Sequence, residues 1–263
     1  MVRRSRLDAE LVRRGLARSR EQAAELVHAG RVKVAGSTAT KPATAVDPAT
    51  PVLVEESGGE PDYASRGGRK LAGALDALPD LRVDGRRALD AGASTGGFTD
   101  VLLRRGAREV VAVDVGYGQL AWRLRTDPRV TVHDRTNVRE LTPETIGGPA
   151  ELTVADLSFI PLTLVLPALA ACTARDGDLL PMVKPQFEVG RERVGAGGVV
   201  RDPQLRAAAV RTVADAAYEL GLGTAGIVRS PLPGPAGNVE FFLWLRRAAP
   251  PVDPDAVSEA VRE

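Results

Sequence analysis

The sequence has little of what disulfide-stabilised or metal-binding proteins need. Among 263 residues there are one cysteine and two histidines. The single thiol, Cys172, excludes a disulfide scaffold and a cysteine-cluster zinc site, and the histidines, His28 and His133, are too few for a His-rich metal site. His28 and Cys172 fall on apolar helix faces, which predicts that both fill the core. We therefore expect no metal ion.

A long apolar run is also missing. The longest stretch, residues 160–172, is interrupted by Pro161, Thr163 and Pro167. It has 13 residues, whereas a membrane-spanning helix needs roughly 20. The basic start of the chain is not followed by the apolar core of a signal peptide. These absences predict a cytoplasmic protein without a membrane partner.

Net charge is nearly absent, because 35 basic residues stand against 34 acidic ones and leave +1. That balance argues against a uniformly basic nucleic-acid binder. The average hides a division, however. Residues 1–41 hold ten Lys or Arg and four acids, a charge of +6, whereas the remaining residues hold 25 and 30, a charge of −5. A basic head therefore precedes a mildly acidic body.

Residues that begin and end helices occur in the basic head at the spacing of a small α+β module. Apolar residues recur at helical spacing before Gly15, and a capping box at Ser19 opens a second helix that ends at Gly30. Extended pieces follow at residues 32–34, 44–46 and 52–55. We expect a small basic RNA-binding domain over 1–60 and a linker over 61–67.

Strand and helix patterns alternate along the body. Strands are expected at 88–90, 110–115, 130–133, 152–156, 179–184, 225–229 and 240–245. Helices are expected near 70–78, 97–105, 118–125, 162–173 and 203–220. This alternation predicts an α/β, doubly wound, mostly parallel seven-stranded Rossmann-like sheet over 68–248, with an antiparallel last strand. Residues 249–263 contain three prolines and are expected to form a loose tail with one or two helical turns.

A glycine-rich turn, residues 90–98, follows the first strand of the body. In open α/β folds such a turn lies at the carboxyl edge of the sheet, where ligands bind. Ser94 stands where a dinucleotide site needs its second glycine, and no lysine follows as in a phosphate-binding loop. The series Gly92, Ser94, Gly96 matches a hydrolase nucleophile elbow, but the histidine that a triad needs, His133, comes too early.

S-adenosylmethionine is the ligand that this pattern favours, with a plain turn as the alternative. An acid that ends the second strand can bind the ribose hydroxyls, and Asp114 has that position. Asp134 is a candidate for the adenine or for a cap. Phe159 is a candidate for the adenine, the target base or the core. The cofactor-binding candidates are Asp90, Gly92, Ser94, Thr95, Gly96, Gly97, Phe98, Asp114, Asp134, Asp156 and Phe159.

Four ionisable residues are expected at the same edge of the sheet. Asp156 and Lys184 end apolar strands, Glu240 begins the last strand, and Lys70 lies on the helix before the first strand. Methylation of a hydroxyl requires a base for its proton, and a lysine serves only when burial or a second cation lowers its pKa from about 10.4. Lys184 is the candidate base. Ordinary surface ion pairs are the alternative.

Several motifs of this sequence resemble those of known protein families. The series Lys70, Asp156, Lys184, Glu240 is similar to the Lys-Asp-Lys-Glu tetrad of FtsJ-type ribose 2′-O-methyltransferases. Residues 6–36 resemble the S4-type RNA-binding domain. Both in this order, with the segments 65–70, 90–98, 114–119 and 184–190, are similar to the TlyA family, once named haemolysins. One departure is that family members carry Arg-x-Trp-Val where this sequence has Pro61-Asp-Tyr-Ala64.

The resemblance implies adenosylmethionine-dependent 2′-O-methylation of cytidine in ribosomal RNA. It also implies a link to susceptibility to ribosome-binding peptide antibiotics, and the extended basic start is similar to the subgroup that modifies the RNA of both subunits. The partners are then ribosomal RNA and ribosomal subunits, with the protein itself a monomer. Basic residues of the head are expected to contact phosphates: Arg3, Arg4, Arg6, Arg18, Arg20 and Lys41.

Other functions stay open on the sequence. A base amino-methyltransferase is suggested by a faint echo of its Asp/Asn-Pro-Pro-aromatic motif in residues 156–159, although both prolines are missing. A catalytically silent RNA-binding or ribosome-assembly factor is a second alternative. A membrane-lytic protein is the third, and it lacks an apolar or amphipathic membrane segment. Residues 231–238 are expected to form a rigid loop at the site entrance.

Overall fold

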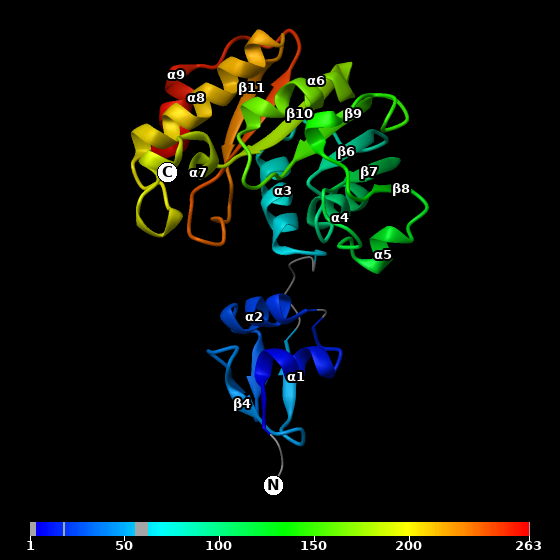
Figure 1. The fold of residues 1–263 in the computed structure, drawn as a ribbon, viewed down its shortest axis with the longest axis vertical. Helices are drawn as coiled ribbons and strands as arrows, with labels where there is room; N and C mark the ends of the chain where they lie inside the picture. Colours follow the sequence, from blue (N-terminus) through cyan, green and yellow to red (C-terminus); the bar gives the residue numbers. More distant parts are fainter. Residues whose placement is uncertain (1–3, 18, 56–62, 263) are drawn as a thin grey trace. The chain divides into compact units, whose positions relative to one another are not determined.

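The computed structural model describes residues 4–17, 19–55 and 63–262, and the chain divides into two compact units, Met1–Asp62 and Tyr63–Glu263 (Figure 1). None of the helices in the described ranges combines the length and the apolarity that a bilayer crossing requires. Within the same ranges no three His, Cys, Asp or Glu side chains gather as a metal site.

The first unit has two helices and short strands. Its elements are β1 (Ser5–Arg6), α1 (Leu7–Arg13), α2 (Arg20–His28), β2 (Val32–Val34), β3 (Ser37–Thr38), β4 (Ala45–Val46) and β5 (Val52–Val54). Strand β2 pairs antiparallel with β3 and β5, and β1 pairs antiparallel with β4. Leu7, Leu11 and Val27 pack with Val32 in its core. Ser19 caps α2 by accepting a hydrogen bond from the Gln22 amide, as a capping box predicts.

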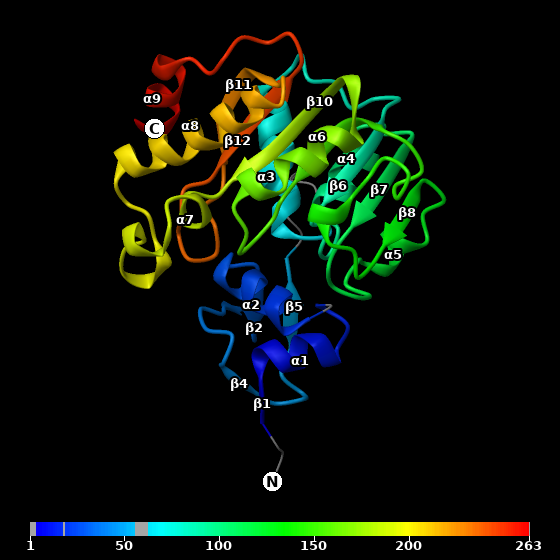
Figure 2. The same ribbon diagram turned by 45° about the horizontal axis from the view of Figure 1, so that its top comes forward.

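The second unit contains the predicted seven-stranded sheet. Its strands are β6 (Arg87–Ala91), β7 (Glu109–Val113), β8 (Val130–His133), β9 (Ala150–Ala155), β10 (Thr173–Val183), β11 (Gly223–Arg229) and β12 (Phe241–Arg246). They lie in the order β11-β12-β10-β9-β6-β7-β8. Strands β6 to β10 are parallel, and β12 is antiparallel to both of its neighbours. The doubly wound, mostly parallel fold is confirmed (Figure 2).

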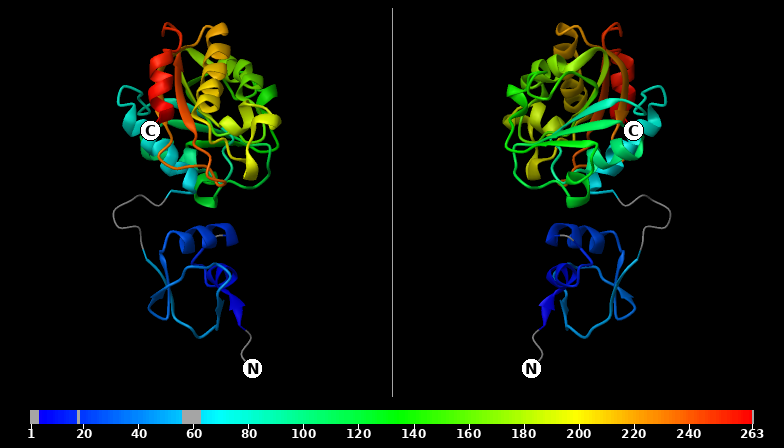
Figure 3. Two further views of the ribbon diagram at one scale, coloured as in Figure 1. Left: turned by 90° about the vertical axis from the view of Figure 1, so that its left-hand side faces the viewer. Right: turned by 90° about the vertical axis from the view of Figure 1, so that its right-hand side faces the viewer.

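Helices cover both faces of this sheet. They are α3 (Arg66–Ala77), α4 (Gly97–Arg104), α5 (Trp122–Arg125), α6 (Leu166–Cys172), α7 (Pro185–Glu188), α8 (Pro203–Glu219) and α9 (Pro254–Arg262). Single 3₁₀ turns lie at Val138–Glu140, Leu162–Leu164, Arg191–Arg193 and Ala196–Gly198. Alternate strand residues enter two apolar clusters, one with α6, α8 and α9 and one with α3 and α4. Figure 3 shows these layers from two sides.

Three expectations need correction. The end of the chain is not a loose tail, because α9 buries Val257 and Val261 against the cluster that α6 and α8 line. His28 lies exposed at the end of α2 instead of in the core, whereas Cys172 is buried as expected. The helix expected from residue 118 begins only at Trp122, because Gly118 has the left-handed φ of +65° that a helix does not tolerate.

Candidate active site

The strand alternation places three of the four tetrad candidates on one face of the sheet. On β10, Leu180 and Met182 enter the cluster around α3 and α4, and Lys184 is the next residue in this series. Asp156 directly follows β9 and Glu240 directly precedes β12, and each continues the matching series of its strand. Because residues two apart share a face, all three lie on the side that α3 covers.

Lys184 and Asp156 form the first of two ion pairs. The Lys184 Nζ lies 2.6 Å from the Asp156 Oδ1, and it donates a hydrogen bond to the Ser158 Oγ at 3.0 Å. Lys184 is buried, whereas Asp156 keeps partial access to solvent. The amine is thus held at the end of β10 by two oxygens from the segment that leaves β9.

Lys70 and Glu240 form the second ion pair. The Lys70 Nζ, from α3, donates to the Glu240 Oε2 at 2.5 Å, and the Glu240 side chain is only 1% exposed. Val183 pairs with Phe241 across the antiparallel strands, so Lys184 and Glu240 follow at opposite positions of the two chains. The structure therefore brings the tetrad candidates together as two adjacent ion pairs, in which two positive and two negative charges balance.

The glycine turn packs its backbone against the segment that carries Asp156. Gly92 has a φ of +88°, and a Cβ there would lie 2.5 Å from the Asp156 carbonyl oxygen. Gly96 has a φ of +97° and contacts side chains of the segment that leads into α5. Gly97 lies directly against the backbone of Gly68 in α3. Backbone conformation and space both require glycine at Gly92 and Gly96, whereas at Gly97 the requirement is for space alone.

Asp114 connects the end of β7 to this turn. Its Oδ2 accepts a hydrogen bond from the Ser94 amide at 2.8 Å, and its Oδ1 accepts one from the Gly116 amide at 2.7 Å. Thr95 contributes its carbonyl oxygen to the Ala121 amide. Each carboxylate oxygen has two lone pairs, so Asp114 can accept further hydrogen bonds from a ligand hydroxyl.

Two further cofactor-binding candidates, Asp90 and Phe98, have buried side chains. Asp90 is fully buried on β6 and its Oδ2 accepts a hydrogen bond from the Thr99 Oγ1 at 2.6 Å. Phe98 is buried in the core, where its ring packs on Phe242 at 6.0 Å between centroids. The Phe98 side chain therefore supports the turn from the core.

Asp134 and Phe159 lie beyond the ends of β8 and β9. Arg125 pairs with Asp134 at 2.7 Å and lowers the pKa of that carboxyl. Phe159 is 90% exposed with a φ of +64°, and its ring contacts the Phe187 ring at 5.2 Å. The core position that the sequence left open for Phe159 is thus wrong. A left-handed, exposed phenylalanine is unusual and points to a functional role.

Comparison with known proteins identifies the family. Residues 63–247 match the model of FtsJ-like methyltransferases, and residues 5–52 match the S4 domain. The chain is 64% identical over 246 residues to the 16S/23S rRNA (cytidine-2′-O)-methyltransferase TlyA of Mycobacterium tuberculosis, covering 94% of this chain and 91% of that protein. The chain belongs to the TlyA family. It is therefore a methyltransferase with an S4 domain before its FtsJ-like unit.

Other TlyA-type relatives match over most of their length. The Bacillus subtilis protein YqxC, described as a candidate rRNA methyltransferase, is 43% identical over 92% of this chain and 86% of its own. The solved structure of a candidate hemolysin from Streptococcus thermophilus has a TM-score of 0.79 and 39% identity, and the match covers 100% of this chain and 96% of that one. The match to this solved structure thus spans both units of the chain.

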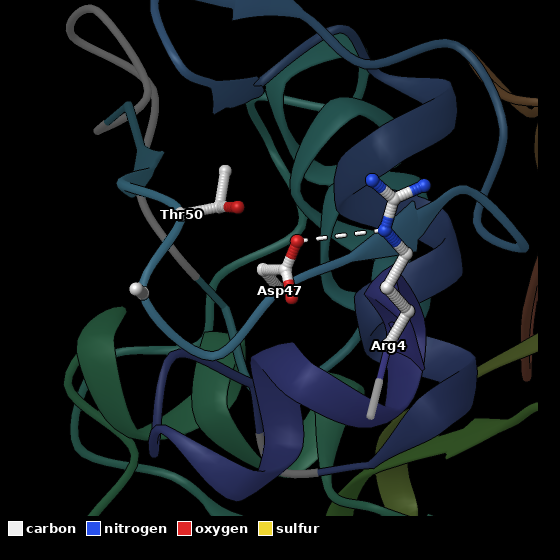
Figure 4. A pocket seen from close by; sticks show the side chains of 4 residues that line it. Arg4, Asp47 and Thr50 are labelled. Atoms are coloured by element: carbon white, nitrogen blue, oxygen red, sulfur yellow. Dashed lines mark ion pairs between the residues drawn. The ribbon is translucent and has the colours of Figure 1, made fainter. Parts of the chain in front are cut away.

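In the S4 domain, the candidate RNA-binding arginines are engaged by acids of the same unit. Arg6 and Arg20 both contact the Asp8 Oδ2, at 2.8 and 3.1 Å. Arg4 lies 3.4 Å from Asp47 beside a surface pocket (Figure 4). Lys41 is exposed. Two further candidates, Arg3 and Arg18, lie outside the described residues.

The sequence did not single out two residues that organise the FtsJ-like unit. Ser158 accepts the hydrogen bond from Lys184, and its place two residues after Asp156 could have indicated it. Asp100, buried in the first turn of α4, accepts the Ala64 amide at 2.8 Å and pairs with Arg104. The Arg104 guanidinium also lies 5.0 Å from the Tyr63 ring centroid. Tyr63 and Ala64 are thus anchored to α4.

Proposed function

We propose that this protein transfers a methyl group from S-adenosylmethionine to the 2′-oxygen of cytidine in ribosomal RNA, with Lys184 as the base. The observation that carries the proposal is the pair of adjacent, buried lysine–carboxylate contacts, Lys184 with Asp156 and Lys70 with Glu240. Buried lysines need partners, and two at one sheet edge indicate chemistry that uses an amine. The TlyA of M. tuberculosis, named for this reaction, supports the assignment.

The residues around the glycine turn fit adenosylmethionine. Gly92 and Gly96 adopt conformations without room for a side chain, and the turn lies beyond the carboxyl end of β6. Asp114 would hold the ribose hydroxyls, Ser94 and Thr95 would line the methionine end, and Asp134 would lie near the adenine. When bound, the cofactor supplies a methyl group that passes from its sulfonium sulfur to the attacking oxygen.

Lys184 removes the proton from the 2′-hydroxyl. Asp156 and Ser158 fix the position of the Lys184 Nζ, so the amine is held in place for the approaching hydroxyl. Glu240 holds Lys70 at the same edge of the sheet as Lys184. After the transfer, the proton resides on the Lys184 Nζ.

The S4 domain supplies affinity for RNA. Its arginines Arg4, Arg6 and Arg20, with Lys41, would contact phosphates and orient the RNA without reading its sequence. Arg3 and Arg18 belong to the same proposal. We propose as substrates the RNA of both ribosomal subunits, as the name of the M. tuberculosis relative states for that protein. Loss of the modification would then alter susceptibility to peptide antibiotics that bind the ribosome.

Phe159 is proposed to stack on an aromatic ring system that approaches the site. Its ring is exposed and is supported on one side by Phe187, which lies directly after the Lys184 segment. The adenine of the cofactor and the target base are the two rings that the sequence left open. A Phe159→Ala variant distinguishes them, because loss of stacking on the adenine weakens cofactor binding, whereas loss of stacking on the base weakens only RNA methylation.

The test is methyl transfer from tritiated cofactor to ribosomal subunits and to free rRNA. We expect label in a nucleotide whose 3′ linkage resists alkaline hydrolysis, because a 2′-O-methyl group blocks that cleavage. Lys184→Ala and the matched Lys184→Arg, which keeps the charge but cannot act as a base, should each lose transfer while retaining cofactor binding. Label on a base would favour an amino-methyltransferase, and no label would favour a silent RNA-binding factor.

A further inference from the structure

Asp90 is a buried carboxyl that the proposed mechanism does not use. It is 0% exposed, and its Oδ2 is held by the Thr99 hydroxyl at 2.6 Å. Its Oδ1 has no hydrogen-bond partner among residues 4–17, 19–55 and 63–262. An orphaned carboxylate oxygen in a buried position is costly and calls for an explanation.

Two further carboxylates flank Asp90 on the neighbouring strands. Asp90 is aligned with Ala112 of β7 and with Val154 of β9, and Asp114 and Asp156 follow those residues by two positions. Residues two apart share a face, so the three acids form a row across adjacent strands below the glycine turn. A ligand that carries positive charge would meet this row at the carboxyl edge.

No lysine of this edge neutralises Asp90. Lys184 is engaged by Asp156, and Lys70 is engaged by Glu240. From α4, the groups that contact Asp90 are the neutral Thr99 hydroxyl and the Thr99 backbone amide. Burial, with a smaller contribution from Asp156 and Asp114, raises the pKa of Asp90 to about 7 despite the Thr99 hydrogen bond.

We propose that Asp90 couples binding of the cofactor to release of a proton, and thereby makes the protein distinguish the sulfonium cofactor from its neutral thioether product in a pH-dependent way. The inference rests on the proposed use of adenosylmethionine. A sulfonium placed over the row of acids stabilises the ionised form of Asp90. Adenosylhomocysteine has an uncharged sulfur at the same position and provides less of this stabilisation.

The linkage between ligand binding and protonation of Asp90 decides how the ligand affinity changes with pH. A cation that lowers the pKa of Asp90 from about 7 binds more tightly as the pH rises through that value, because the proton no longer has to be displaced. From about pH 6 to about pH 8 the affinity for adenosylmethionine should rise by about tenfold, and that for adenosylhomocysteine by no more than about twofold. The displaced proton passes to the buffer.

The experiment is isothermal titration calorimetry of the full chain with each ligand, in two buffers of different ionisation enthalpy. Near neutral pH, Asp90→Asn should lower the proton release on binding of adenosylmethionine by more than it lowers the release on binding of adenosylhomocysteine. The sulfonium also lowers the pKa of the cofactor's own amino group, so each ligand is compared with itself on the wild type and on the variant.

Glu188→Gln is the matched control. Burial raises the pKa of Glu188 to about 7 as well, but its carboxylate accepts the Leu162 amide and lies outside the row of acids. This variant should keep the wild-type proton release. Thr99→Val removes the hydrogen bond to Asp90 and should move the pH midpoint of adenosylmethionine affinity upward, which tests the inference even if Asp90→Asn does not fold.

An equal change of proton release for both ligands in Asp90→Asn would overturn the inference, as would an unchanged release with adenosylmethionine. Binding of adenosylmethionine without this linkage would leave the methyltransferase proposal standing. Binding of neither ligand would overturn that proposal and the role of Asp90 together.

Discussion

Replacing Gly92 by alanine tests how the glycine turn supports the catalytic residues. Gly92 has a φ of +88°, and its new Cβ would lie 2.5 Å from the Asp156 carbonyl oxygen and 2.9 Å from the Leu157 Cδ2. A left-handed alanine costs about 1–2 kcal/mol, and crowding against packed atoms costs about 1–3 kcal/mol more. The free energy of unfolding should therefore fall by about 2–5 kcal/mol.

Gly85→Ala provides the matched comparison. Gly85 also has a left-handed φ, +71°, but no atom lies within 4 Å of its hypothetical Cβ. This variant should lose only the strain of about 1–2 kcal/mol. For a unit of this size each kcal/mol lowers Tm by about 2–4 °C. Urea and thermal unfolding measure both losses.

The activities of the two variants should differ more than their stabilities. In Gly92→Ala the backbone of Asp156 has to move, and Asp156 holds the Lys184 Nζ, so methyl transfer should fall steeply even where the protein is folded. Gly85→Ala should transfer methyl groups at the wild-type rate. Equal stability and equal activity of the two variants would refute the close contact between the turn and the Asp156 segment.

Two further predictions concern buried ion pairs. Glu240→Gln leaves the Lys70 ammonium buried beside a neutral amide and should lower the free energy of unfolding by about 3–5 kcal/mol, measured by urea unfolding; an unchanged midpoint would contradict a buried pair. In the S4 domain, the Arg6 hydrogen bond holds the pKa of Asp8 at about 2, below its usual 3.8. Stability from this pair is present above about pH 4 and is lost as the pH falls toward 2, so NMR should show an acid transition in the S4 domain that Asp8→Asn weakens.

The sequence predicts the sheet and the ends of its strands well. Apolar runs that end in Asp156 and Lys184 indicate both the strands and the edge at which the charged residues meet, because in each strand the apolar run ends where the charged residue begins. The ion pairs of each lysine could not be assigned in advance. They depend on the antiparallel register that sets Lys184 opposite Glu240, and on how α3 packs.

Packing between segments that are distant in the sequence explains why the burial of the C-terminal helix and the packing of the Phe98 ring were not predicted. The prolines near residue 250 suggested a loose tail, yet Val257 and Val261 have the i,i+4 spacing that a helix buries against a core. The sequence predicts Phe98 near the cofactor because it ends the glycine motif, and it does not reveal that the Phe98 ring packs on Phe242 of β12. Composition and motif position do not reveal such contacts.

Arg6 and Arg20 both pair with Asp8, and this pairing weakens the dependence of RNA binding on the positive charge of the S4 domain. A guanidinium already paired with a carboxylate neutralises a phosphate less completely and so releases fewer of the cations condensed on the RNA. It also loses less side-chain freedom when the phosphate arrives. The salt dependence of RNA binding should thus report fewer displaced ions than the number of arginines at the interface. The formal charge of +6 on residues 1–41 therefore overstates the long-range attraction between this domain and RNA. The paired arginines would instead contribute by being held in position before the RNA arrives.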